Sequence, residues 1–347
     1  MSAITNALTG VIQWIYGLIQ NHGWSIVIFT ILIRLVLMPL DVSSRKGMRR
    51  MAKIQPQLTA LQKKYANDRA KLQQKQSELM RREHYNPLSG CLPLLIQMPI
   101  LFAMFGAMRA VANEKIVEQV FTFLQGGAPQ YEGWLWVKNI WEADSLFAPV
   151  APSIGSVQMI GFDVWHSAWV RLSEAQQAGV LANIAQYVPT FTGTLDFSTA
   201  DALKNSMSAI TSAMAQMPLY LEQIAKMPGF EGGLNLFLFR LDVFRQYNGL
   251  LILPILAGVT QLVMTKLNPQ AAGQAPAAQG QGGMGNFMKY VFPIFSVYIC
   301  LTSNAAFALY WVTSNVIASA MTYGINIYFD RKEKAGEAQR LEEGAIK

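Results

Sequence analysis

Five long apolar segments constrain this chain more than any other feature. They cover residues 23–40, 92–111, 250–267, 287–302 and 307–329. Each is close to the roughly 20 residues that a helix needs to cross about 30 Å of hydrocarbon. The chain is 52% hydrophobic and 14% charged, whereas soluble domains are about 25% charged. The sequence therefore predicts an all-α polytopic membrane protein with five transmembrane helices.

The charges between these segments predict the orientation. Residues 42–85 contain twelve Lys or Arg and three Asp or Glu, whereas residues 113–248 contain seven basic and twelve acidic residues. Loops rich in Lys and Arg stay on the cytoplasmic side of a membrane. We therefore expect a multi-pass plasma membrane protein with its N-terminus outside and its C-terminus in the cytoplasm.

The basic segment 42–85 itself has helical periodicity and predicts a cytoplasmic helical hairpin. Ile54, Leu58 and Leu61 share one face, Leu72 and Leu79 mark another, and Asp68 can cap the second helix. Such a hairpin is either a solvated helix pair or a surface for lipid headgroups or nucleic-acid backbones, and we favour lipid. The candidate capture residues on it are Arg45, Lys46, Arg49, Arg50, Lys53, Lys63 and Lys64.

Residues 113–248 are too long for a simple connection and predict an extracytoplasmic helical insertion. Within it, 173–187 and 198–226 have helical patterns, with Ser198 or Thr199 as a cap. The stretch 234–243 is predicted to be an interfacial or packed helix. Trp134, Trp136 and Trp141 suit an aromatic belt at the membrane interface.

The remaining segments complete the predicted organisation. Ile4, Leu8, Ile12, Ile15 and Ile19 recur at helical spacing and predict an interfacial amphipathic helix over 1–22. The Gly/Ala/Gln-rich stretch 268–286 predicts a flexible cytoplasmic linker, and its G-x-G-x-x-G match has no preceding strand. The predicted transmembrane helices are 23–41, 86–112, 249–267, 287–303 and 306–329, and 330–347 forms a cytoplasmic tail.

No motif for bond-changing chemistry is present. The sequence has no phosphate-binding loop and no cluster of His, Cys and carboxylates with metal-ligand spacing. The three histidines, His22, His84 and His166, fall in different segments. We therefore expect neither enzymatic activity nor a cofactor, metal or small-molecule substrate.

Arg34 is the only charged residue in the segment 23–40. Its guanidinium keeps its proton, and placing it in hydrocarbon costs about 3 kcal/mol on insertion scales. Arg34 can reach toward Asp41 at the cytoplasmic edge, but that residue is about 10 Å along the helix. Thr30 lies one turn away on the same face. This polar stripe favours a hydrated cavity that opens toward the cytoplasm.

Other polar residues interrupt the apolar segments and usually face a protein interior or a watery cavity. They are Thr30, Gln97, Thr260, Gln261, Ser296, Tyr310, Trp311, Thr313, Ser314 and Asn315. For any single one of these residues we favour a hydrogen bond between helices, worth about 0.6 kcal/mol.

Four motifs resemble the YidC/Oxa1/Alb3 membrane protein insertases. They are Ile-Arg-Leu-x-x-Met-Pro-Leu at 33–40, Asn-Pro-Leu-x-Gly-Cys-x-Pro-Leu-Leu-Ile-Gln-Met-Pro-Ile at 86–100, Leu-Pro-Ile-Leu-x-Gly-x-Thr-Gln at 253–261 and Leu-Tyr-Trp-Val-Thr-Ser-Asn at 309–315. The resemblance is to the short bacterial form typical of Gram-positive organisms, except that 152–233 is longer than the family core needs.

The resemblance implies that the five helices enclose a hydrophilic groove around Arg34. Gln261 and Trp311 match positions that line it, and Thr30, Gln97, Thr260, Tyr310 and Asn315 would complete its wall. The hairpin would first capture a nascent membrane protein or its ribosome. The nascent protein would then enter the groove and leave sideways into the phospholipid bilayer without ATP. The insertase would act alone or beside the Sec translocon.

Two other functions remain open. A transporter would use Arg34 to bind an anionic solute, although the chain shows no internal repeat. An assembly scaffold would tolerate polar substitutions at Arg34, Gln261 and Trp311.

Overall fold

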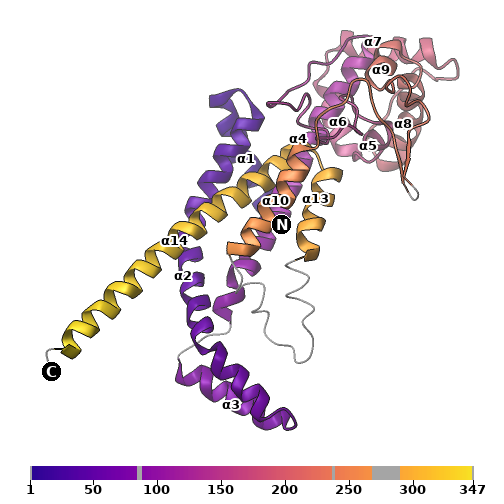
Figure 1. Ribbon diagram of the computed structural model, residues 1–347. Coiled ribbons are helices and arrows are strands. Elements are labelled where there is room, and N and C mark those ends of the chain that lie inside the picture. The colour runs from indigo at the N-terminus through magenta and orange to yellow at the C-terminus, as the bar shows by residue number, and fades with distance from the viewer. Residues whose placement is uncertain (1, 84–87, 237–238, 268–289, 346–347) are drawn as a thin grey trace. The chain divides into compact units, whose positions relative to one another are not determined.

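The computed structural model describes residues 2–83, 88–236, 239–267 and 290–345, and these are predominantly helical (Figure 1). The helices are α1 (Ser2–Ile19), α2 (His22–Lys64), α3 (Arg69–Arg82), α4 (Leu88–Leu124), α5 (Ile154–Gln158), α6 (Phe162–Arg171), α7 (Glu174–Tyr187), α8 (Ala200–Met214), α9 (Pro218–Gln223), α10 (Ile252–Leu267), α13 (Phe292–Thr302) and α14 (Ala305–Ala345). The predicted helical class is confirmed. The predicted linker 268–286 lies outside the described residues.

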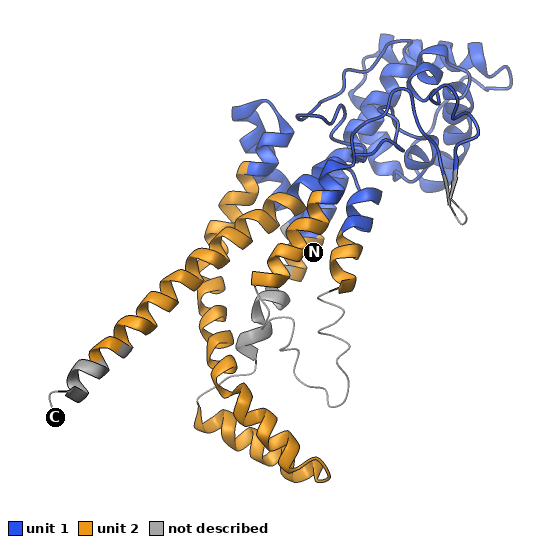
Figure 2. Ribbon diagram, viewed as in Figure 1, with its two compact units in different colours: residues 1–27, 103–255, 297–310 blue, residues 28–102, 256–296, 311–347 orange. Residues whose placement is uncertain are grey.

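The chain forms two compact units (Figure 2). Unit 1 comprises residues 1–27, 103–255 and 297–310, and unit 2 comprises residues 28–102, 256–296 and 311–347. Several helices contribute one end to each unit. By length and hydropathy, α2 and the part of α14 up to Gly336 qualify as membrane spans, and α10 and α13 are shorter apolar helices. The number of spans therefore stays a prediction.

Unit 1 contains the core of the predicted helical insertion. Phe121 on α4 packs edge-on against Trp165 on α6, with ring centroids 5.4 Å apart, and Trp165 stacks on Phe197 at 5.8 Å. Aromatic pairs in these geometries add to the stability that comes from burial alone. The second half of α4 is thus part of this core, although we expected the helix to end near residue 112.

Local capping explains where the helices of unit 1 begin. Ser173 and Gln176 form a reciprocal capping box at α7, and the Thr199 hydroxyl caps α8. Of the two predicted caps, Thr199 is the one observed. The predicted helix 198–226 is two helices, because Pro218 occupies the first turn of α9 and cannot continue α8.

The prediction of a helix over 234–243 is wrong. Leu234–Leu236 (β1) pairs antiparallel with Phe239–Leu241 (β2), with Leu234 opposite Leu241. Gly233 immediately before β1 has a φ of +71°, and this left-handed conformation interrupts a helix. The stretch is also only ten residues long, and isolated helices shorter than about 12–15 residues are marginally stable.

Unit 2 contains the predicted basic hairpin. Helix α2 runs without a break from the first apolar segment into the hairpin and includes Pro39 and Pro56. Its Ile54 and Leu58 form a small core with Leu79 of α3. The Asp68 carboxylate caps α3 by accepting a hydrogen bond from the Lys71 amide. The predicted Asp68 cap is confirmed, and the two helices form a hairpin whose cytoplasmic location stays a prediction.

Candidate functional site

Arg34 on α2 contacts Ser314 on α14, and both residues belong to unit 2. The guanidinium donates two hydrogen bonds to the Ser314 hydroxyl, one from Nε over 3.0 Å and one from Nη2 over 2.5 Å. One serine oxygen can accept both because it has two lone pairs. Ser314 is buried and Arg34 is half-buried. The contact therefore orients the guanidinium while part of the residue stays accessible.

Thr30 lies on α2 one turn before Arg34 and is buried. Residues four apart on a helix share a face, so Thr30 and Arg34 form the polar stripe that the sequence predicts.

A second polar contact joins α10 to α14 in unit 2. The Asn315 side-chain amide donates to Gln261 Oε1 over 3.2 Å and approaches the Thr260 hydroxyl at 3.4 Å. The Thr260 hydroxyl also donates back to the carbonyl of Leu256 in its own helix. Three predicted groove residues are therefore neighbours. This arrangement is equally what a hydrogen bond between two membrane helices requires.

The other predicted groove residues have different surroundings. Trp311 is buried in unit 2, with its ring 6.2 Å from that of Phe292. Tyr310 is buried in unit 1, with its ring 6.3 Å from that of Phe307. Gln97 lies within α4, but its side chain is outside the described part of the structure.

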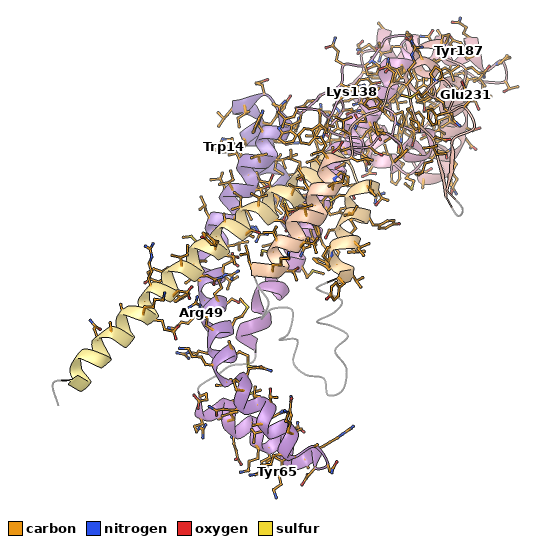
Figure 3. All side chains as sticks on the ribbon, in the orientation of Figure 1. Trp14, Arg49, Tyr65, Lys138, Tyr187 and Glu231 are labelled. Atoms are coloured by element: carbon orange, nitrogen blue, oxygen red, sulfur yellow. The ribbon has the colours of Figure 1, made fainter. Side chains whose placement is uncertain are left out.

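Three residues of the predicted capture surface contact α14. Arg45 donates to the Thr322 hydroxyl. Arg49, labelled in Figure 3, donates to the Asn326 carbonyl at 3.0 Å and to Asp330 at 2.5 Å. Lys53 pairs with Glu333 at 2.5 Å. Partner numbers rise together along both helices, so α2 and α14 run parallel here. The exposed basic residues of the predicted set are Lys46, Arg50, Lys53, Lys63 and Lys64.

Ser314 is one of the polar residues in the apolar segments, but it was not among the residues predicted to form the groove wall. The available signal was its position three residues after Trp311, which places both on neighbouring parts of one helix face. The described residues contain no group of three or more His, Cys, Asp or Glu side chains that could hold a metal ion.

A turn in unit 1 holds the first residues of the two helices that carry these contacts. Its carbonyls at Glu142 and Ile140 accept from the amides of Ala305 and Ala306, at 2.8 and 2.9 Å. The buried Asp144 carboxylate accepts from the amides of Leu250 and Leu253, at 2.8 and 2.7 Å. The turn therefore satisfies amides at the beginning of both α14 and α10, which have no partner within their own helix.

Comparison with known proteins places these observations in a family. The chain matches the family described as 60Kd inner membrane protein over residues 14–221 and 201–333. The chain belongs to this family. It is therefore a membrane protein, and the predicted resemblance is confirmed.

Similar curated proteins carry the name membrane protein insertase YidC. The one from Fusobacterium nucleatum is 50% identical over 26% of this chain and 45% of its own length. The one from Clostridium perfringens is 37% identical over 42% of this chain and 59% of its own length. The one from Aromatoleum aromaticum is 42% identical over 30% of this chain and 19% of its own length. The matches thus span less than two thirds of each relative.

Proposed function

We propose that this protein is a membrane protein insertase, which receives nascent membrane proteins and releases their apolar segments into the bilayer. The observation that carries the proposal is the half-buried Arg34 held by Ser314 inside an apolar segment. Family membership and the names of the relatives support it. The proposed location is the bacterial plasma membrane, with five spans, an external N-terminus and a cytoplasmic C-terminus.

Arg34 acts as a fixed positive charge in a hydrophilic groove. A polar tail that crosses the membrane faces a smaller barrier where a groove shortens the apolar path, and a carboxylate in that tail can pair transiently with the guanidinium. Ser314 keeps the guanidinium oriented before the substrate arrives. The wall of this groove includes Thr30, Gln97, Thr260, Gln261, Tyr310, Trp311 and Asn315.

Release requires no nucleotide. Each central Leu, Ile, Phe or Val of a substrate segment gains about 0.3–0.6 kcal/mol on the insertion scale. A segment of about 20 such residues therefore supplies enough free energy to leave the groove sideways into lipid.

The exposed cations of the hairpin are candidates for first contact. Lys46, Arg50, Lys63 and Lys64 face solvent, and such cations attract anionic headgroups or the phosphates of a ribosome. Arg45, Arg49 and Lys53 hold α14 beside α2 instead. The insertase works alone or beside the Sec translocon.

The test is complementation of a strain depleted of its own insertase, with protease protection of a substrate tail as the readout. Arg34→Ala should strongly reduce translocation of an acidic tail, and Arg34→Lys should retain most of it because the charge remains. Ser314→Ala should give an intermediate loss, because the charge persists but loses its orientation. A matched substrate with a neutral tail is the control.

Equal translocation of the acidic tail by Arg34→Ala and Arg34→Lys would refute the role of the charge. Failure of every variant and of the unsubstituted protein to insert any substrate would refute the insertase assignment.

A further inference from the structure

A tight turn in unit 1 exposes the apolar side chain of Leu135, whose backbone has an unfavourable conformation. Leu135 has a φ of +50° and is 67% exposed. The turn is closed by two backbone hydrogen bonds of 2.9 Å between Trp134 and Val137. Left-handed backbone is unfavourable for a leucine, which carries a Cβ and has no polar side chain to compensate. Strain of this kind persists where surrounding structure enforces it, and it marks candidate functional positions.

The turn is joined to the beginning of α2 by an aromatic cluster, which we define as Trp24, Trp134 and Trp136. Trp134 lies edge-on to Trp24 at 5.7 Å and to Trp136 at 5.6 Å. Gly23 permits this approach, because a Cβ there would lie 2.3 Å from the Trp134 ring. The cluster is therefore built around a glycine that a larger residue could not replace without displacing Trp134.

Polar contacts fix the same corner. The Glu132 carboxylate accepts from the His22 backbone amide at 2.5 Å and lies 2.6 Å from its Nδ1. The Trp136 indole donates to Asp144 at 3.1 Å. Residues on both sides of Leu135 are thus held by contacts within unit 1, which keeps Leu135 at the tip of the turn.

We propose that Leu135 and the aromatic cluster insert into the outer leaflet, at the boundary between headgroups and acyl chains. Trp24 is 47% exposed and is the second residue of the apolar segment 23–40, so it stands where that segment enters the membrane. Tryptophan rings favour this depth. The partner is consequently a lipid surface, because the exposed tip is continuous with residues that begin a membrane segment.

Two further features fit a lipid partner. Lys138, labelled in Figure 3, follows the turn directly. Its ammonium lies 4.4 Å from the Tyr247 ring centroid, so a cation stands next to the apolar tip, as is typical of interfacial anchors. Helix α1 of the same unit exposes Val11, Trp14 and Leu18 on its outer face while Ile12 and Ile15 are buried.

The test is fluorescence of an environment-sensitive dye attached at Leu135→Cys. The background is the full chain with Cys91→Ser and Cys300→Ala, reconstituted in phosphatidylethanolamine and phosphatidylglycerol vesicles. Met159→Cys is the matched control, because Met159 is an equally exposed apolar residue of unit 1, at 71%. Lipids with nitroxides in the headgroup or upper acyl chain should quench the dye at 135 at least about twofold more than at 159.

Two outcomes would overturn the proposal. Equal quenching at both positions would show that Leu135 lies no closer to the lipid than the control residue. A blue-shifted emission at 135 without nitroxide quenching would show that a protein surface covers it.

A second variant separates the anchor from a packing role. Leu135→Asn should leave the midpoint of thermal unfolding in detergent unchanged or higher, since asparagine tolerates a positive φ. A lower midpoint would mean that Leu135 stabilises the unit itself and would also contradict the proposal.

Discussion

Glu142 is a residue whose chemistry depends on its tertiary surroundings. Its Oε1 is buried with no hydrogen-bond partner among the described residues, and so is the hydroxyl of Tyr131. Burial raises the pKa of Glu142 to about 8, and burial, followed by the charge of Glu142, raises the pKa of Tyr220 to about 12. An isolated carboxyl in such surroundings favours its neutral form.

This pKa predicts how stability depends on pH. The folded state binds the Glu142 proton more tightly than an unfolded chain, whose value is near 4.5. The free energy of unfolding should therefore fall as pH rises from 4.5 to 8, by at most about 1.4 kcal/mol per pH unit from this group. Glu142→Gln should remove that slope. Chemical denaturation of both proteins across this range measures the difference, and identical pH profiles would contradict the assignment.

At the scale of elements, the turn from Asn139 to Asp144 organises two helices at once. The Asp144 carboxylate accepts a hydrogen bond from an amide at the beginning of α10, while the carbonyls of Ile140 and Glu142 accept from amides at the beginning of α14. Gly249 packs closely against Asp144, and only a glycine fits there, since a Cβ at this position would lie 2.0 Å from Asp144 Oδ1. The two helices that carry Gln261 and Asn315 thus share one anchor at their beginnings.

Replacing this anchor should be costly. Asp144→Asn keeps the shape but exchanges one acceptor oxygen for a donor that faces an amide, so the free energy of unfolding should fall by about 1–3 kcal/mol. Asp163→Asn, at an exposed position in the first turn of α6, is the control and should change it by less than about 0.5 kcal/mol. Denaturation in detergent followed by tryptophan fluorescence gives both values. Equal effects would show that the Asp144 contacts contribute little.

The whole molecule is electrically asymmetric along its sequence. Residues 42–85 are strongly basic and residues 113–248 are acidic, and this difference is the basis of the proposed orientation.

In a background without cysteines, Lys63→Cys should react with a membrane-impermeant maleimide only after the cytoplasmic side is opened. Lys204→Cys should react on intact cells. Both positions are exposed, so the reverse pattern would mean that the topology is inverted.

The sequence alone determined the features that depend on near neighbours in the chain. Helical class follows from apolar periodicity, and the Asp68 and Thr199 caps follow from contacts three residues apart. By contrast, Trp141 was predicted from its residue type alone to lie in an interfacial belt, and this prediction is wrong. Trp141 is buried with its ring 4.8 Å from that of His22, because packing and not residue type decides which tryptophans face outward.

Only the tertiary structure decided which polar residues meet. Arg34 and Ser314 are 280 positions apart, and Asp144 and Leu253 are 109 apart. Periodicity predicts which face of a helix is polar, but it does not specify which helix that face contacts or in which register. The sequence therefore identified Arg34 as a charge that needs a polar environment, and the parallel packing of α2 with α14 supplied Ser314 as its partner.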